Sequence, residues 1–210
     1  QPRNIVQLLY KFKNRSPDDE QAICEAYVFA FMPETLQKVI RAGLDMTDVK
    51  IYTWQIFNGL DFLTSRSIAH RDLKPVNILV NHEIGLLQIA DFGSAKIIHR
   101  GSKSTAYQVT RHYRPPEMLL GSREYTHRID VWSAGCIMGE MLKGYELFPG
   151  RTQEDQLCLI IAALGVPSGR DKTRMRLPRD AKIPEGVKFR GIEHAQHLRD
   201  RNGRLHPRLG

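Results

Sequence analysis

Two short motifs separated by a predicted hairpin constrain this chain more than any other feature. The first is the run His70-Arg71-Asp72-Leu73-Lys74-Pro75-Val76-Asn77, and the second is Asp91-Phe92-Gly93. Between them, residues 78–80 and 86–89 have the apolar character of short strands, joined by a polar turn at 81–85. This order places Asp91 just beyond a strand end, where its side chain can be held rigidly.

The side chains of these motifs are of the types that phosphate chemistry uses. Asp72 is a candidate base, and Lys74 lies close enough in the chain to neutralise charge on a transferred phosphate. Asn77 offers a neutral oxygen ligand and Asp91 an anionic one, and such hard oxygen ligands suit Mg2+. Either motif alone arises readily by chance, whereas the eight-residue run followed by Asp91-Phe92-Gly93 does not. The pair therefore predicts a magnesium-dependent site.

The remaining pattern reads as two strands followed mostly by helices. Strands are predicted over 5–12 and 23–31, with a polar turn at 14–20, and helices over 47–65, 129–142 and 153–164. Thr47 is the predicted N-cap of the first helix, and Thr152 with Asp155 forms a predicted capping box for the last. The helix over 129–142 is apolar on most sides and is expected to be buried. Beyond Ser168 no periodic pattern remains.

Charge and cysteine usage narrow the class of protein. The formal net charge is +8, and seven of these charges lie from Arg170 onward. A run of this kind is most often solvated surface, so nucleic-acid binding by the tail is the weaker alternative. Three widely spaced cysteines without a C-x-x-C pattern indicate free thiols and a cytoplasmic or nuclear location. No apolar run is long enough to span a membrane.

Further motifs follow in a fixed order: Asp91–Lys96, Arg111–Glu117, Asp130–Cys136, Phe148–Gly150, Asp155–Leu157 and Leu164–Pro167. With them the chain resembles a eukaryotic protein kinase, and more narrowly the glycogen synthase kinase-3/shaggy family of the CMGC group, from Asn4 to Ser168. The resemblance implies an α+β, protein-kinase-like fold, mostly the helical C-terminal lobe with remnant strands of the N-terminal lobe. It divides the chain into an N-terminal-lobe remnant with the hinge (1–34), a partial C-terminal lobe (35–168) and a basic tail whose composition is compatible with disorder (169–210).

The resemblance implies ATP and Mg2+ as cofactors and protein substrates as partners. It gives Asp72 and Lys74 catalytic roles, makes Asn77 and Asp91 the metal ligands, and likens Asp130 to the aspartate that braces the catalytic loop. Residues at the adenine site would be Ala30, Met32 and Leu79. The phosphate of a primed substrate would meet Arg71 and Lys96.

Two further implications concern regulation and docking. Tyr107 resembles the activation-loop tyrosine that the family phosphorylates, with Arg111 and Arg114 placed to pair with its phosphate. A half-buried loop tyrosine without that role is the alternative. The helix over 153–164 and the loop after it align with a docking surface for scaffold peptides, although Leu157, Ile160, Ile161 and Leu164 could equally be core.

The function implied is transfer of the ATP γ-phosphate to Ser or Thr hydroxyls of proteins, often primed ones. The 210 residues contain no Gly-x-Gly-x-x-Gly, and no strand lysine or helix glutamate of the kind that completes the nucleotide site. A noncatalytic pseudokinase fragment acting as a binding module is therefore the alternative. The intact set of Asp72, Asn77 and Asp91 favours the enzyme, because a binding module needs no magnesium ligands.

Overall fold

We describe the protein from a computed structural model, in which residues 2–15, 23–99, 101, 103–105 and 108–192 are described. The helices are α1 (Leu36–Ala42), α2 (Met46–Thr64), α3 (Pro116–Leu119), α4 (Arg128–Lys143), α5 (Gln153–Leu164) and α6 (Gly169–Arg174). The strands are β1 (Leu8–Arg15), β2 (Ile23–Phe29), β3 (Glu34–Thr35), β4 (Ile68–Ala69), β5 (Ile78–Asn81), β6 (Leu86–Ile89) and β7 (Lys96–Ile97). Single 3-10 turns are η1 (Pro75–Asn77), η2 (Phe92–Ser94) and η3 (Arg111–Tyr113). The predicted α+β class is confirmed.

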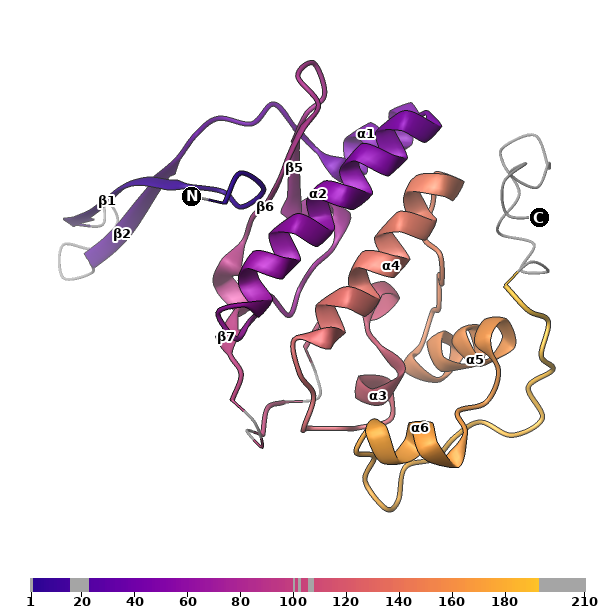
Figure 1. The fold of residues 1–210 in the computed structure, drawn as a ribbon. Helices are drawn as coiled ribbons and strands as arrows, with labels where there is room; N and C mark the ends of the chain where they lie inside the picture. The colour runs from indigo at the N-terminus through magenta and orange to yellow at the C-terminus, as the bar shows by residue number, and fades with distance from the viewer. Residues whose placement is uncertain (1, 16–22, 100, 102, 106–107, 193–210) are drawn as a thin grey trace.

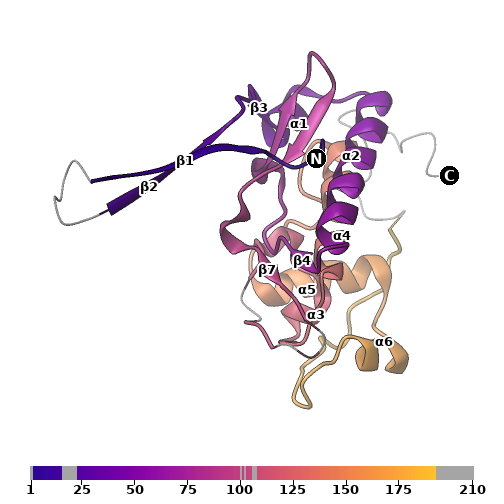
Figure 2. The same cartoon turned by 60° about the vertical axis from the view of Figure 1, so that its left-hand side comes forward.

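The body of the molecule is built around α2 and α4, which pack side by side (Figure 1). An antiparallel sheet of order β3-β5-β6 packs against α2 and, with α1, forms one end of the body, while α3, α5 and α6 form the other (Figure 2). The core runs through both ends and includes the fully buried side chains of Tyr52, Ile56, Leu87, Ile129 and Ile137. A separate two-stranded pairing of β4 with β7 joins the two motif-bearing segments.

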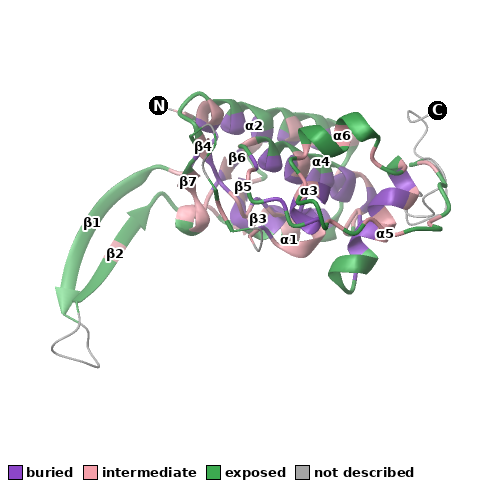
Figure 3. Cartoon of the chain, turned by 90° about the horizontal axis from the view of Figure 1, so that it is seen from below, coloured by how far each residue is buried: buried purple, intermediate pink, exposed green. Residues whose placement is uncertain are grey.

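The β1–β2 hairpin stands apart from the body. Figures 1 to 3 show this two-stranded ribbon projecting away from the helices, and almost all of its residues are exposed.

The prediction that the first strand begins at Ile5 is wrong. Ile5 instead forms a parallel bridge to Ile89 and is 9% exposed, so its apolar character serves the core of the body and not the ribbon. Asn14 and Arg15, which were predicted to belong to the polar turn at 14–20, belong to β1, and residues 16–20 lie outside the described residues.

Helix α5 has the predicted bounds, and α4 is confirmed within one residue at each end. The Thr152 hydroxyl accepts the N–H of Asp155 at 3.1 Å, but the Asp155 carboxylate accepts the N–H of Arg151 at 2.8 Å, so the box is not reciprocal. Buried residues occur on most sides of α4, as expected.

The N-cap predicted for α2 is wrong. Asp45, and not Thr47, caps the helix, because its carboxylate accepts the N–H of Asp48 while the Asp48 carboxylate accepts the N–H of Asp45. This reciprocal box satisfies two of the free N–H groups at the helix start. Three short helices, α1, α3 and α6, were not predicted, and α6 lies beyond Ser168, where no pattern was found. No helix among the described residues combines the length and the apolar character needed to cross a membrane.

Candidate active site

The loop that follows β4 is fixed by a single buried carboxylate. Asp130 on α4 is 2% exposed and accepts the backbone N–H of His70 at 2.7 Å and of Arg71 at 3.0 Å. Arg71 has a positive φ of 67°, a conformation that costs energy for a residue with a side chain and needs support from its surroundings. Burial raises the pKa of Asp130, and the two N–H groups oppose that rise by stabilising the charged form. Helix α4 thereby supplies a bracing contact of the kind that the resemblance implied for Asp130.

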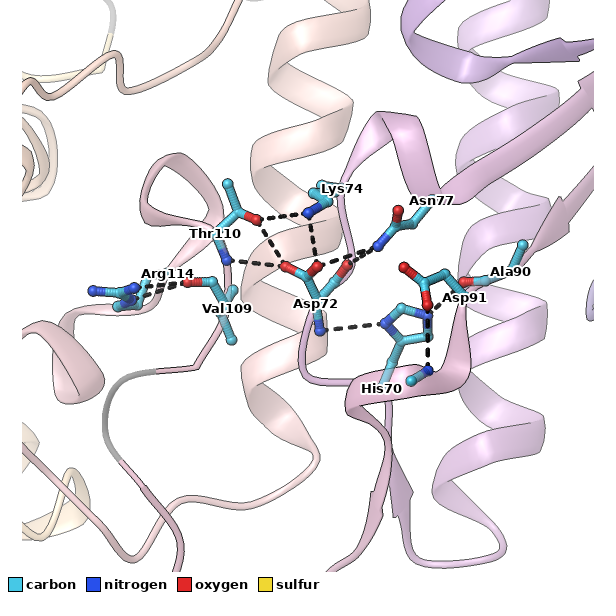
Figure 4. A network of polar contacts seen from close by, with 10 residues as sticks. His70, Asp72, Lys74, Asn77, Ala90, Asp91, Val109, Thr110 and Arg114 are labelled. Carbon is cyan, nitrogen blue, oxygen red and sulfur yellow. Dashed lines mark hydrogen bonds and ion pairs between the residues drawn. The ribbon is translucent and has the colours of Figure 1, made fainter. Parts of the chain in front are cut away.

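His70 ties the two motifs together. Its ring is completely buried, with Nε2 2.8 Å from the carbonyl oxygen of Ala90 and Nδ1 3.3 Å from the backbone N–H of Asp72. These partners assign the proton to Nε2, which donates to Ala90, while Nδ1 accepts from Asp72. Phe92 meets the His70 ring edge-on at 5.1 Å. Asp72 and Asp91 are thus held in a fixed relation by a neutral histidine between them (Figure 4).

The Asp72 carboxylate lies at the centre of a polar network (Figure 4). One oxygen accepts the N–H of Thr110 at 3.1 Å and its hydroxyl at 2.7 Å, and the other lies 2.7 Å from Lys74 Nζ. Lys74 also donates to the Thr110 hydroxyl at 3.0 Å. Partial burial acts to raise the pKa of Asp72, but Lys74 and Thr110 outweigh it and leave that pKa below the usual value. Asp72 is therefore ionised at neutral pH and fixed in orientation.

Asn77 and Asp91 present oxygen atoms beside this network. The Asn77 amide nitrogen donates to the Asp72 carbonyl at 2.9 Å and to its carboxylate at 3.3 Å, which leaves the amide oxygen for another partner. Asp91 is exposed, has a φ of 58°, and its carboxylate accepts the N–H of Gly93 at 3.3 Å. The backbone N–H of Ala90 donates to the carbonyl of Asn77 at 2.9 Å, so Asp91 follows a residue bonded to Asn77, and Figure 4 draws both side chains beside Asp72.

This pair fits a magnesium ion that keeps water and phosphate oxygens as its other ligands. Among the described residues, no group of three or more His, Cys, Asp or Glu side chains is placed to hold a metal ion. The Asp91 carboxylate and the Asn77 amide oxygen would supply two oxygen ligands to such an ion.

Two of the residues predicted at the adenine site, Ala30 and Met32, come from the segment between the ribbon and the body, and the third, Leu79, is on β5. Pairing of β3 with β5 sets Thr35 opposite Leu79, so the chain just after Met32 runs beside the strand that leads out of the catalytic loop. Leu79 and Met32 are half-buried, and Ala30 is exposed. The structure thus shows that the segment after Met32 leads into the strand paired with β5, which carries Leu79.

The basic residues predicted to bind phosphate have internal partners. Arg71 Nε donates to the carbonyl of Ser94 at 2.6 Å, and Lys96 Nζ donates to the Ser104 hydroxyl at 2.9 Å. Because β4 pairs with β7, Ala69 lies opposite Lys96, which sets Lys96 near the start of the catalytic loop and Arg71. Both side chains therefore belong to one region, where Lys96 contacts Ser104 in the activation segment, the stretch between β7 and η3.

The two arginines predicted to pair with a phosphotyrosine hold the segment before α3. Arg111 Nη1 donates to the carbonyl of Arg151 at 2.6 Å. Arg114 is 6% exposed and donates to the carbonyl of Val109 from Nε at 3.1 Å and from Nη2 at 2.9 Å. These bonds support Val109, a β-branched residue with a φ of 67°. Tyr107 lies outside the described residues.

Sequence reasoning missed Thr110. It bonds both Asp72 and Lys74, although it lies 38 residues after Asp72 in the chain. No local pattern marks it, since a threonine between Val109 and Arg111 fits an ordinary loop. Only the fold, which returns this loop to the catalytic segment, identifies it.

Comparison with known proteins agrees with this geometry. A family model of the protein kinase domain matches residues 1–189. The protein kinase gsk3 of Schizosaccharomyces pombe is 40% identical over 171 residues, which make up 79% of this chain and 44% of that relative. Glycogen synthase kinase 1 of Pyricularia oryzae is 39% identical over 191 residues, 87% of this chain and 48% of that relative. The chain spans about half the length of these curated relatives.

Proposed function

This chain belongs to the protein kinase family, and from that premise we propose that it carries the phosphoryl-transfer segment of a serine/threonine protein kinase. The observation that carries the proposal is the ionised, oriented carboxylate of Asp72, held by Thr110 and Lys74 beside the oxygens of Asn77 and Asp91. The resemblance to glycogen synthase kinases, seen first in the motifs, is supported by the two relatives.

Each side chain has a distinct task in this proposal. Asp72 accepts the proton of the substrate hydroxyl and orients its oxygen for in-line attack. Lys74 neutralises charge that develops on the transferred group. Asn77 and Asp91 would hold Mg2+, which when bound with ATP shields the phosphate oxygens. His70 and Asp130 act through position alone, by fixing the loop that carries Asp72.

The test is phosphate transfer from ATP to serine, threonine and tyrosine peptides by the 210-residue protein. We expect transfer to Ser and Thr, and a loss of about 100- to 10,000-fold on Asp72→Asn, the usual range for removing a general base. Asp180→Asn, at an exposed carboxylate distant in sequence from the motifs, is the matched control and should leave the rate unchanged. Absence of any transfer by the unmodified protein, with ATP still bound, would support the noncatalytic alternative instead.

A preference for primed substrates is a finer part of the proposal. It is supported by the common location of Arg71 and Lys96 beside the activation segment, since guanidinium and ammonium groups bind phosphate through charge-assisted hydrogen bonds. Lys96→Ala should lower the rate on a phosphopeptide more than on its unphosphorylated form. An equal effect on both peptides would remove this role.

Docking of a scaffold peptide on α5 and the loop after it is supported by exposure at its C-terminal end. Leu164, Val166 and Phe189 are 51%, 58% and 62% exposed, and a pocket of about 910 Å3 lies between Leu164 and Phe189. Leu157, Ile160 and Ile161 are core residues, so only the end of α5 remains for docking. Phe189→Ala should weaken capture of an apolar helical peptide without changing the fold.

Two proposals have indirect support. Tyr107 as a phosphorylation site rests on the resemblance and on Arg111 and Arg114 in the segment that follows. A cytoplasmic or nuclear location rests on Cys24, Cys136 and Cys158, which are free thiols. Phosphopeptide mapping would test the phosphorylation of Tyr107. Fractionation of the cells that make the protein would test its location.

A further inference from the structure

The turn η3 is backed by buried titratable side chains that the proposed reaction does not use. η3 begins directly after Thr110, whose N–H and hydroxyl hold Asp72 (Figure 4). Behind η3, Glu140 and Lys143 on α4 are only 4% and 3% exposed. Buried acidic and basic side chains are uncommon, because each must be neutralised or paired. A change of charge in this cluster therefore acts next to the segment that orients Asp72.

Hydrogen bonds connect the cluster to the active site. The Tyr113 hydroxyl, on the last residue of η3, donates to Glu140 Oε2 at 2.6 Å, and the Ser133 hydroxyl donates to the Tyr113 carbonyl at 2.9 Å. The Tyr113 N–H donates to the Thr110 carbonyl at 2.9 Å, while the Thr110 hydroxyl donates to Asp72 at 2.7 Å. A continuous route thus leads from Glu140 through Tyr113 and Thr110 to Asp72.

Titratable and charged groups from several elements face Glu140. Among the described residues they are Tyr113 on η3, Cys136 and Lys143 on α4, Glu146 in the loop after α4, and Arg41 at the end of α1. Lys143 is held in place by the carbonyls of Glu146 at 3.0 Å and Leu147 at 3.3 Å, and the Glu146 carboxylate lies 4.0 Å from His112 on η3. Burial, with a smaller contribution from Glu146, raises the pKa of Glu140 to about 7, although Tyr113, Lys143 and Arg41 oppose the rise. The charge on Glu140 therefore changes near neutral pH.

From this arrangement we infer that the charge on Glu140 controls how firmly η3 holds Thr110 against Asp72. Neutral Glu140 is buried at little cost and accepts the Tyr113 hydroxyl. Ionised Glu140 favours arrangements that admit water, because a buried charge is costly. Water at Glu140 displaces Tyr113, and η3 then holds Thr110 less firmly. The effect on η3 is independent of the reaction, whereas the resulting effect on phosphoryl transfer rests on the proposed function.

Hydrogen exchange of the Thr110 amide measures this contact directly, because its N–H donates to Asp72 at 3.1 Å. Protection of this amide, corrected for the intrinsic pH dependence of exchange, should fall by about tenfold or more between about pH 6 and pH 8.5. The side chain introduced by Glu140→Gln cannot ionise but can still accept from Tyr113, so protection should stay constant in that variant. Glu83→Gln, at an exposed carboxylate, is the control and should follow the parent protein.

Two neighbours of Glu140 provide variants that leave this side chain in place. Glu146 raises the pKa of Glu140 and Arg41 lowers it. Glu146→Gln should therefore move the fall in Thr110 protection to lower pH, and Arg41→Gln should move it to higher pH. Glu146 is half-buried and Arg41 is exposed, so these two variants retain the fold even where Glu140→Gln does not. Opposite shifts would not arise from a merely structural role of Glu140.

The rate of phosphoryl transfer provides a second readout. The kcat of the parent protein, divided by that of Glu140→Gln, should fall by about threefold or more over the same pH range. The ratio cancels the titration of ATP and of the peptide substrate. KM for ATP should not change, because Asp72 orients the acceptor hydroxyl and not the nucleotide.

Three results would overturn the inference. The first is Thr110 protection that does not change with pH in the parent protein, and the second is a change that persists in Glu140→Gln. The third is a shift in the same direction for Glu146→Gln and Arg41→Gln. Absence of phosphoryl transfer together with the expected pH dependence of Thr110 protection would contradict the proposed function and support this inference.

Discussion

At the scale of single residues, Asp130 shows how one buried carboxylate can organise a loop. It accepts the N–H groups of both His70 and Arg71. Asp130→Ala would leave two buried donors unsatisfied, which costs about 2–4 kcal/mol of unfolding free energy. Urea denaturation should show this loss, while Asp180→Ala at an exposed position should change the stability by less than about 0.5 kcal/mol. Equal effects of the two substitutions would contradict the bracing role.

Glu140 makes the stability depend on pH. It is 4% exposed, it accepts a hydrogen bond from Tyr113 at 2.6 Å, and burial raises its pKa from 4.5 to about 7. Glu146 raises that pKa further, whereas Tyr113, Lys143 and Arg41 oppose the rise. The unfolded chain releases this proton at lower pH than the folded one, so the unfolding free energy should fall as pH rises from 4.5 to 7.

Glu140→Gln separates this contribution from the others. The amide cannot ionise but can still accept from Tyr113, so the fall between about pH 5 and pH 7 should be smaller in the variant, by on the order of 2 kcal/mol. The free energy of unfolding at several pH values measures it, with exposed Glu83→Gln as the control. Lys143 acts in the other direction at higher pH: burial lowers its pKa to about 8, so stability should rise again above pH 8. Parallel pH profiles for the parent protein and Glu140→Gln would refute the assignment.

Single residues also show how much of the candidate site can be predicted from the sequence. Asp72, Lys74, Asn77 and Asp91 lie in contiguous motifs, so their chemistry can be read before the fold is known. Thr110 cannot be found in this way, because its meaning comes from a contact across 38 residues. The role of Asp130 was predicted only by resemblance, because an aspartate in an apolar helix can have several structural roles.

At the scale of elements, the start of α2 tests how well capping rules identify the N-cap residue of a helix. Thr47 has a good capping side chain, but Asp45 and Asp48 form the reciprocal box three residues apart. Asp45→Ala should cost about 1 kcal/mol of unfolding free energy, whereas Thr47→Ala, inside the helix and exposed, should change it little. Thermal or urea unfolding of both variants measures the two losses of unfolding free energy. A larger loss for Thr47→Ala would restore the original N-cap prediction.

Elements were predictable where a boundary signal and a periodic pattern agreed. Helix α5 has Thr152 at its start and Gly165 at its end, and its bounds were predicted without error. Helices α1, α3 and α6, of seven, four and six residues, are too short for a periodic pattern to stand out. The start of β1 was misplaced because an apolar residue, Ile5, belongs to the core of the body and not to the strand beside it.

At the scale of the whole molecule, the β1–β2 ribbon has two different faces. Directly opposite residues share a face, so Tyr10 with Val28 and Phe12 with Ala26 form an apolar side, while Lys13 with Glu25 lies on the charged side. No residue of the ribbon belongs to the hydrophobic core cluster. The apolar side is therefore exposed in this chain, and two-stranded ribbons are only marginally stable in water. Exposed apolar strands of this kind promote aggregation.

The double variant Phe12→Thr/Val28→Thr should reduce aggregation without weakening the body. Threonine keeps the strand propensity and removes apolar surface, and neither original side chain belongs to the core. Light scattering at rising concentration should show slower aggregation, while the unfolding free energy of the body stays within about 0.5 kcal/mol of the parent. Lys11→Thr/Lys13→Thr, on the charged side of the same ribbon, should not slow aggregation. If the apolar-side variant instead destabilised the body, the ribbon would be packed against it, and amide hydrogen exchange across 8–15 and 23–29 would be slow where we expect it to be fast.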